Sequence, residues 1–278
     1  MTYIDFRLYF LGRVSRADIC NRFGIASAVA TRELALYRRI APDNLAIEQQ
    51  SRQYVTTAGF RPVFEYALER VLVALSSGFG ETEQEPVAPL ISSDFIRSIS
   101  CPDMDVLSCV SRAIHLGYAL DIGYHSNGSG YDRREIVPGA IVDNGLRWHV
   151  RAYDRSHEGF RDFVLTRVES PKISSQPPCV GERLDQDAQW TRLVDLDLIP
   201  HPGCRQPEVI ERDFSMSDGV LRMRVRAANA GYVLRRWNVD CSVGHTLSAH
   251  EHLLALRNPL SLYGVTSAVL APGFTPAE

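Results

Sequence analysis

The side chains at the beginning of one segment, residues 27–39, can form hydrogen bonds with DNA. If the segment is a helix, Ser27, Ala28, Thr31 and Arg32 lie toward solvent near its beginning. A guanidinium can bind the N7 and O6 atoms of guanine together, and a threonine hydroxyl can contact a base or a phosphate. The sequence therefore predicts a DNA contact here, with further arginines at the phosphates: Arg38, Arg39 and Arg52.

A second group of polar side chains lies in a segment that alternates with period two. In residues 148–153, His149 and Arg151 fall on the face opposite Val150 of a predicted strand. We expect the apolar face to pack on a core, which leaves the polar face available to a ligand.

The next predicted strand, residues 160–168, places Arg161 and Arg167 on the face that also carries Phe163 and Leu165. A surface of arginine, histidine, tyrosine and serine suits anions, especially phosphates that carry stacked bases. Arginines on a half-exposed sheet can equally be solvated and bind nothing.

Neither a catalytic group nor a metal site is indicated by the remaining polar residues. His125 and Ser126 are neighbours, but no Gly-x-Ser-x-Gly sequence surrounds the serine. His250 and His252 would share one face of a strand, yet no His-Glu-x-x-His sequence or cysteine pair completes a site. A phosphate-binding loop and a dinucleotide-binding sequence are also absent from the sequence. We expect no enzyme activity, no metal ion and no cofactor.

Three helices are expected to position the DNA-contacting residues. Residues 3–11 carry an apolar stripe that is typical of a first helix. Ser15 and Asp18 have the spacing of a capping box for a second helix, and Gly24 suits the left-handed conformation that ends it. A third helix is predicted from Ser27 to Arg39. The apolar residues expected to form one small core are Ile19, Phe23, Ile25, Ala30 and Leu34.

A hairpin is expected after the third helix. Residues 45–47 and 53–55 alternate like two short strands around Gln50 and Ser51, as in the wing of a winged helix-turn-helix. Helix-glycine-helix units also occur in proteins that never bind DNA. The hairpin and the local charge favour DNA binding here, since residues 1–61 hold nine arginines and five acidic residues while the whole chain has net charge −3.

The middle of the chain is predicted to change from helices to strands. Pro62 begins a helix-like stretch whose apolar stripe can form a dimer contact or pack on the wing or the next domain. Residues 76–105 have the composition of a linker. A short helix from Met104 to His115 is followed by several short strands, and Asn144-Gly145 is a strong hairpin signal. This pattern predicts a small, curved antiparallel sheet or barrel.

The composition is that of a soluble, globular protein. The chain has 278 residues, enough for two or three domains, with 45% hydrophobic and 23% charged residues. Its six cysteines are scattered without a Cys-x-x-Cys pair, which indicates a reducing compartment. No signal sequence or membrane span of about 20 apolar residues is present in the sequence, so we expect a cytoplasmic protein with no membrane contact.

The middle of the chain resembles the WYL domain of bacterial transcriptional regulators. The triplet that names this domain, Trp-Tyr-Leu, is here Trp148-His149-Val150, a form similar to the branch of WYL repressors found in BREX and CBASS anti-phage defence islands. The segments that carry the resemblance are Tyr124-x-Ser126, Arg134-Glu-Ile-Val-Pro138, Trp148-His-Val-Arg-Ala-Tyr-Asp154 and Arg161-Asp-Phe-x-Leu-x-Arg167.

The resemblance implies an α+β protein of several domains. These are a winged helix-turn-helix at residues 1–60, a linker helix and connection at 61–104, and a WYL domain at 105–185. The WYL domain is expected to be a small Sm- or SH3-like antiparallel β-barrel. An α/β extension called WCX would occupy residues 205–278, where residues 221–226 have the alternation of a strand with Arg222, Arg224 and Arg226 on one face.

The resemblance also implies a function. Such a protein would be a homodimeric repressor of an anti-phage defence operon that binds a palindromic operator in double-stranded DNA. A nucleotide, an oligonucleotide or another anion bound by the WYL domain would relieve repression. A non-specific nucleic-acid-binding scaffold and an activator of the same architecture are the alternatives. The pocket positions implied by the family are Tyr124, Ser126, Arg134, His149, Arg151, Arg161 and Arg167.

Overall fold

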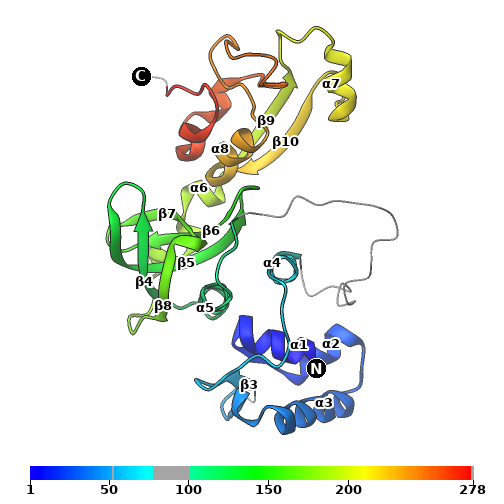
Figure 1. Ribbon diagram of the computed structural model, residues 1–278, viewed down its shortest axis with the longest axis vertical. Helices are drawn as coiled ribbons and strands as arrows, with labels where there is room; N and C mark the ends of the chain where they lie inside the picture. Colours follow the sequence, from blue (N-terminus) through cyan, green and yellow to red (C-terminus); the bar gives the residue numbers. More distant parts are fainter. Residues whose placement is uncertain (52, 78–99, 277–278) are drawn as a thin grey trace. The chain divides into compact units, whose positions relative to one another are not determined.

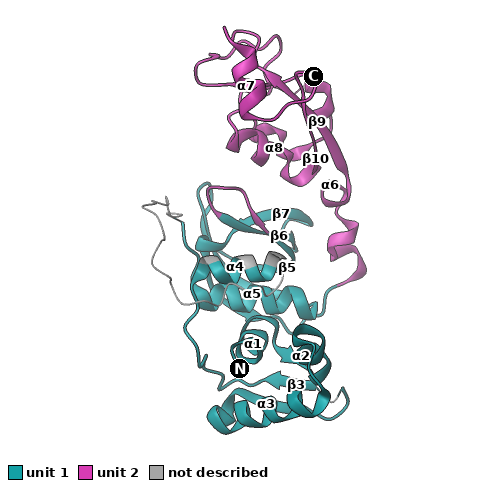
Figure 2. Cartoon of the chain, turned by 90° about the vertical axis from the view of Figure 1, so that its right-hand side faces the viewer, with its two compact units in different colours: residues 1–141, 148–178 teal, residues 142–147, 179–278 magenta. Residues whose placement is uncertain are grey.

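The computed structural model describes residues 1–51, 53–77 and 100–276. The chain divides into two compact units, shown in different colours in Figure 2. The first unit contains residues 1–141 and 148–178, and the second contains residues 142–147 and 179–278. Each unit has its own hydrophobic core.

The first unit begins with a winged helix-turn-helix fold (Figure 1). Three helices precede a small antiparallel sheet of order β1-β3-β2, in which β2 and β3 form the expected wing. Residues 7–11 continue the first helix as one turn of π-helix, so the predicted first helix is present. The elements are α1 (Thr2–Phe6), β1 (Arg13–Val14), α2 (Arg16–Phe23), α3 (Ser27–Ile40), β2 (Leu45–Glu48) and β3 (Gln53–Thr56).

The two ends of α2 are formed by the residues that the sequence indicated. The Ser15 hydroxyl accepts a hydrogen bond from the Asp18 amide at 3.1 Å, and the Asp18 carboxylate accepts one from the Ser15 amide at 2.7 Å. Gly24 adopts φ 63°, and its amide donates to the Cys20 carbonyl. The capping box and the left-handed glycine turn are therefore confirmed.

The core of the winged helix is close to the predicted one. Ile19, Ala30 and Leu34 are buried, and Tyr37 of α3 is buried with them. The prediction for Phe23 is wrong, because its side chain is 50% exposed. Phe23 is the last residue of α2, at the rim of this core, where its ring lies edge-on to that of Tyr3 at 5.4 Å.

The helix predicted to begin at Pro62 begins later, as α4 (Leu68–Ser77). The residues before α4 are not helical, because they bind a buried carboxylate instead. Both oxygens of Asp5 accept hydrogen bonds from the Val63 amide, and the Tyr66 hydroxyl donates to the same carboxylate at 2.7 Å. Most of the predicted linker lies outside the described residues.

The next helix, α5 (Met104–Leu116), confirms the helix predicted from Met104 to His115. The Asp103 side chain caps it by accepting from the amides of Asp105 and Val106, and Gly117 ends it with φ 71°.

A five-stranded antiparallel sheet follows, with the order β7-β6-β5-β4-β8. In the described residues it is open, with β7 and β8 as its edges, and it is not closed into a barrel. Residues 130–143 form one continuous strand of 14 residues. The strands are β4 (Leu120–Ser126), β5 (Gly130–Asp143), β6 (Trp148–Asp154), β7 (Gly159–Val164) and β8 (Val168–Ile173).

The predicted strand at residues 160–168 is divided in the structure. β7 ends at Val164, and residues 165–167 form a turn of 3₁₀-helix before β8 begins. Arg167 therefore does not share a strand face with Arg161, because the strand alternation that would align them is interrupted between them.

Part of the N-terminal helical segment belongs to the hydrophobic core of the sheet within the first unit. Phe6, Tyr9 and Phe10 from the N-terminal helical segment pack with buried residues of α4, α5 and the sheet. The Tyr9 hydroxyl donates to the Asp105 carboxylate at 2.8 Å, and the Ser111 hydroxyl donates to the Phe10 carbonyl at 2.8 Å. The N-terminal helical segment and α5 are thus packed together directly.

The second unit contains a three-stranded antiparallel sheet of order β10-β9-β11. The strand predicted at residues 221–226 is confirmed, with its arginines exposed and its apolar residues packed on the core. Residues 227–236 form the helix α8, and β11 is a strand of three residues. The elements are α6 (Ala188–Thr191), β9 (Leu193–Pro200), α7 (Pro207–Asp213), β10 (Leu221–Arg226), α8 (Ala227–Arg236) and β11 (Leu254–Leu256).

No helix among the described residues is long and apolar enough to cross a membrane.

Candidate DNA-binding and ligand-binding sites

The two sides of α3 differ sharply in exposure. Ala30, Leu34 and Tyr37 on one side are completely buried in the winged-helix core. The predicted base-contacting residues all lie on the exposed part of its first two turns: Ser27, Ala28, Thr31 and Arg32. Burial of one side anchors the helix, and the exposed side is the one that a recognition helix presents to the major groove.

The arginines of α3 are available to bind phosphates or bases. Arg32, Arg38 and Arg39 are exposed, and no ion pair engages them within the part of the chain that the structure describes. The Thr31 hydroxyl donates to the Ser27 carbonyl at 2.9 Å, a local bond that a DNA acceptor can replace. The predicted phosphate contact Arg52 lies outside the described residues.

The orientation of α3 depends on a buried network around Asp5. The Tyr37 hydroxyl donates to the Asp5 carboxylate at 2.5 Å and accepts a hydrogen bond from the Asn44 side chain at 2.9 Å. Burial and the hydrogen bond to Asp5 raise the pKa of the Tyr37 phenol, so it remains a donor at neutral pH. Because Asp5 also binds Val63 and Tyr66, α3 is connected to the segment that leads into α4.

The predicted ligand-binding residues do not form a single group in the structure. Directly paired residues of antiparallel strands lie on the same side of a sheet. Arg134 pairs with Ile122 and Arg161 with Ala152, which places both arginines on the side that carries the core. Arg151 pairs with Asp162, on the opposite side. The sheet therefore separates the arginines into two groups.

The first group surrounds the buried carboxylate of Asp154. Arg134 donates to Asp154 at 2.9 Å, and its guanidinium lies over the rings of Tyr124 and Phe163 at 5.7 and 5.9 Å. The exposed Arg161 approaches the same carboxylate at 4.0 Å. The structure thus brings Tyr124, Arg134 and Arg161 together around Asp154.

The polar atoms of this first group differ in whether they already have hydrogen-bond partners. The Arg134 Nε atom is buried and has no hydrogen-bond acceptor among the described residues, and the carboxylate of Asp132 is 3.9 Å from it. The Tyr124 hydroxyl accepts a hydrogen bond from the Val164 amide at 3.1 Å, so it helps to fix β4 against β7. His157 binds Asp154 at 2.8 Å from the turn after β6.

The second group lies on the other side of β6. Arg151 forms an ion pair with Asp162 at 3.2 Å, and the His149 Nε2 atom is 4.0 Å from the same carboxylate. Both side chains are buried, so the expectation that this side of the strand is open to a ligand is wrong. The pairing of a strand arginine with the aspartate directly across from it explains the burial, because the carboxylate neutralises the charge.

The remaining two predicted residues lie apart from both groups. Ser126 ends β4, and its hydroxyl accepts hydrogen bonds from the amides of Gly128 and Ser129 in the following turn. Arg167 lies at the end of the 3₁₀ turn and is partly buried. Ser126 therefore has a clear structural role in the β4–β5 turn.

Asp154, Asp162 and Phe163 are the residues that the sequence analysis missed. Each lies inside a segment that was quoted for the resemblance, but none was assigned to a site. The signal that could have identified the aspartates is charge balance, because a buried arginine requires an anionic partner.

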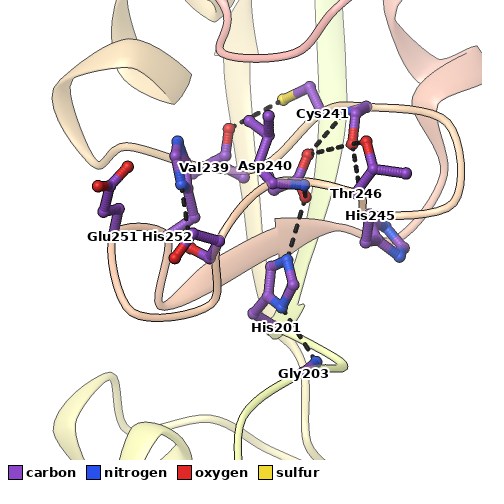
Figure 3. Close-up of polar contacts among 12 residues, drawn as sticks. His201, Gly203, Val239, Asp240, Cys241, His245, Thr246, Glu251 and His252 are labelled. Carbon is purple, nitrogen blue, oxygen red and sulfur yellow. Dashed lines mark hydrogen bonds and ion pairs between the residues drawn. The ribbon is translucent and has the colours of Figure 1, made fainter.

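A third polar cluster lies in the second unit, around the buried Asp240 (Figure 3). Its carboxylate accepts hydrogen bonds from the Ser242 amide and hydroxyl, from the Leu247 amide at 3.0 Å and from the His201 ring at 3.0 Å. Burial raises the pKa of Asp240, but these hydrogen bonds outweigh it and hold the pKa below its ordinary value. His201 accepts from the Gly203 amide through Nδ1, so Nε2 carries the proton that binds Asp240.

The Asp240 cluster has the geometry of a hydrogen-bond network that stabilises the fold. Each oxygen of the carboxylate is occupied by donors of this chain, and no group of three or more potential metal-ligating side chains occurs in the described part of the chain.

Three protein-family models match consecutive parts of the chain. The winged helix-turn-helix domain of the BrxR transcriptional regulator matches residues 1–76, and the WYL domain matches residues 105–173. The C-terminal dimerization domain of the BrxR transcriptional regulator matches residues 193–262.

Similar curated proteins carry one description, DNA-binding transcriptional repressor CapW. The protein from Escherichia coli (strain KTE188) is 31% identical over 279 residues, which cover 95% of this chain and 90% of that protein. The relative from Stenotrophomonas maltophilia is 31% identical over 91% of this chain and 87% of its own length. The relative from Pseudomonas aeruginosa is 32% identical, with coverages of 86% and 82%.

Proposed function

The chain belongs to the family of the DNA-binding transcriptional repressor CapW, and from this premise we propose that it is a homodimer that binds a palindromic operator and releases it when an anionic ligand binds the WYL domain. The family consists of regulators, and enzyme activity is not part of the proposal. The observation that carries the DNA-binding part concerns the two sides of α3. Its exposed side carries arginines that form no ion pair among the described residues, and its opposite side is completely buried.

We propose that Ser27, Ala28, Thr31 and Arg32 contact base edges and that Arg38 and Arg39 contact phosphates, with Arg52 on the wing as a further phosphate contact. Two copies of α3 related by a two-fold axis would enter successive major grooves. A dimer of this kind reads a palindrome, because each half-site meets the same residues. The controlled genes are proposed to be an anti-phage defence operon, in keeping with the repressors that the sequence resembles.

The ligand is proposed to bind the Asp154 group, formed by Tyr124, Arg134, Asp154, Arg161 and Phe163. The unsatisfied Nε of Arg134 and the exposed guanidinium of Arg161 are donors that a phosphate or carboxylate oxygen can accept from. The adjoining aromatic rings offer a surface for a base. These features support a nucleotide, an oligonucleotide or another anion as the effector.

The residues on the opposite side of β6, His149 and Arg151, are proposed to support this site from behind. Their contacts with Asp162 tie β6 to β7, the two strands that carry Asp154, Arg161 and Phe163. A ligand on the Asp154 side cannot reach both groups at once, since the sheet lies between them.

Release of DNA requires that the ligand bind the DNA-free conformation more tightly than the DNA-bound one. The shared core of the first unit supplies a physical connection, because Phe6, Tyr9 and Phe10 lie between the helices of the DNA-binding fold and the sheet. A change of packing beneath Tyr124 and Phe163 would thus alter contacts with the winged helix.

The test compares Arg32→Ala with Arg133→Ala on the duplex upstream of the protein's own gene. Arg133 is an exposed arginine of β5, on the face opposite Arg134 and remote in sequence from α3. We expect Arg32→Ala to weaken operator binding by about 1–3 kcal/mol, or roughly 5- to 150-fold, and Arg133→Ala to change it less than twofold. Equal effects would contradict base recognition by α3. A reporter gene behind the same operator then separates repression from activation.

A further inference from the structure

The second unit exposes a concentrated group of apolar side chains. Val243, Leu260, Tyr263 and Val269 are 77, 73, 76 and 69% exposed, and all four line one groove of about 460 Å³. Scattered apolar side chains are normal on a protein surface, but a contiguous group of large ones indicates a surface that another molecule covers.

None of the described residues that line the groove is charged. Its floor is continuous with the core of the unit, because Leu262 and Val265 belong to both. An uncharged apolar surface suits a copy of itself, since bringing two copies together opposes no like charges. The lining residues are Val243, Pro259, Leu260, Leu262, Tyr263, Gly264, Val265, Thr266, Val269, Phe274, Thr275 and Pro276.

The edges of the β10-β9-β11 sheet are poor alternatives for joining two copies. Pairing of two β10 strands would place Arg222, Arg224 and Arg226 of each copy close to those of the other on one face. The outer edge of β11 is already hydrogen-bonded, because the Asp240 amide donates to Leu254 and its carbonyl accepts from Leu256. Strand addition is therefore disfavoured at either edge.

The matched family model connects the groove to dimer formation. The C-terminal dimerization domain of the BrxR regulator matches residues 193–262, which include Val243, Leu260 and Leu262. The match ends at Leu262, and the other lining residues, which include Tyr263 and Val269, come after it in the chain. The domain named for dimerization thus forms one part of an uncovered apolar groove, and its two sheet edges are unsuitable for pairing.

We propose that this groove is the dimer interface and that its occupant is the same groove of a second copy of the chain, in a two-fold arrangement. The inference rests on the homodimer part of the proposed function and names its surface. An isologous interface of this kind buries the four exposed side chains in both copies at once.

The experiment uses two matched substitutions in the full chain. Val269→Glu places a carboxylate in the groove, and Val180→Glu places one on an equally exposed valine of the same unit that does not line the groove. Sedimentation equilibrium measures the dimer dissociation constant of each variant and of the wild type. We expect Val269→Glu to raise the constant at least a hundredfold, because the charge would be buried without a partner, and Val180→Glu to change it less than threefold.

A second variant removes apolar surface without adding charge. Leu260→Ser combined with Tyr263→Ser should also raise the constant by at least tenfold, while circular dichroism and thermal unfolding stay close to wild type because both side chains are largely exposed. If Val269→Glu does not fold, this variant tests whether the groove is the dimer interface.

The outcomes separate the two levels of the proposal. A wild type that dimerises while both groove variants remain dimeric would overturn the groove and leave the proposed function intact. A wild type that is monomeric with and without operator would contradict the homodimer itself. If the Val180→Glu control dissociates the dimer as strongly as the groove variants do, the effect is not specific to the groove. This result would also overturn the groove as the dimer interface.

Discussion

At the scale of single residues, the protein depends on buried aspartates whose charges are satisfied in different ways. Asp5 is bound by two tyrosine hydroxyls and an amide, Asp154 by Arg134, and Asp240 by amides, a hydroxyl and His201. Removing a carboxylate from water is unfavourable unless such donors replace the water. Each aspartate therefore fixes the positions of its donors. Removal of a donor leaves a buried negative charge that is less well compensated.

Loss of the Arg134 side chain should destabilise the first unit. Arg134→Ala leaves Asp154 buried without its main cationic partner, and we expect the free energy of unfolding to fall by about 3 kcal/mol. Urea denaturation followed by circular dichroism measures the change. The neighbouring Arg133→Ala, on an exposed position, should cost less than about 0.5 kcal/mol. Similar losses for the two variants would show that Arg134 does not neutralise Asp154.

The depressed pKa of Asp240 predicts a pH dependence. Because the folded-state pKa lies below the unfolded value of about 3.9, the carboxylate contributes stability above that pH, and the contribution is lost as the pH falls through the folded pKa. Asp240→Asn should lower stability by about 2 kcal/mol at pH 7. The difference between wild type and variant should shrink as the pH is lowered from about 5 to 2, as measured by urea unfolding at each pH. A difference independent of pH would contradict this account of the carboxylate.

At the scale of elements, α3 combines a structural side and a functional side. The buried side is completed by Tyr37, whose bond to Asp5 sets the helix against the segment before α4. The exposed side carries arginines with no ion pair among the described residues. Substitutions on this exposed side should therefore change DNA binding without changing the fold.

Two arginines of α3 should have different effects on DNA binding. Arg39→Ala is expected to weaken binding to every duplex alike and to reduce the slope of log K against log salt by about 0.9, because one phosphate contact is lost. Arg32→Ala is expected to reduce the preference for the operator over other sequences. Titrations at several salt concentrations with operator and scrambled duplexes measure both quantities. Identical behaviour of the two variants would place both arginines in the same kind of contact.

The elements that depend on local signals could be predicted from the sequence. The capping box at Ser15, the turn at Gly24, the wing and the Asn144-Gly145 hairpin rest on neighbouring residues, and the structure has all of them. The late start of α4 depends on Asp5, more than 55 residues away along the chain, so no local pattern showed it.

The candidate ligand site was predicted less completely, for a physical reason. Period-two alternation assigns a residue to one face of a strand, but it does not say which face is buried when both are. Arg134 was identified, whereas its partner Asp154 depends on the pairing of β5 with β6. The division of the arginines between two sides of the sheet likewise depends on register, which a single sequence does not fix.

At the scale of the whole molecule, the five-stranded sheet and the N-terminal helical segment of the DNA-binding fold share a core in the first unit. Phe10 is completely buried within this shared core, and Leu34 belongs to the separate core of the winged helix. A shared core is expected to unfold as one cooperative unit, whereas a separate core can open locally.

Two core truncations test this cooperativity. Phe10→Ala, which should cost about 3–5 kcal/mol, is expected to speed amide hydrogen exchange in α2, in α3 and in the strands from β4 to β8 together. Leu34→Ala should speed exchange chiefly in the winged helix. Hydrogen exchange followed by mass spectrometry compares them, and an effect of Phe10→Ala confined to the winged helix would show that the core does not couple the two parts.

Sequence-specific DNA binding can be measured by titrating the purified protein with two duplexes at two salt concentrations. One duplex is the sequence upstream of its own gene, and the other is a scrambled sequence. The account predicts a preference for the upstream duplex of about a hundredfold or more that survives moderate salt, because base contacts add to phosphate contacts. Equal affinity for the two duplexes, abolished by salt at the same rate, would contradict it and reduce the winged helix to a non-specific anchor.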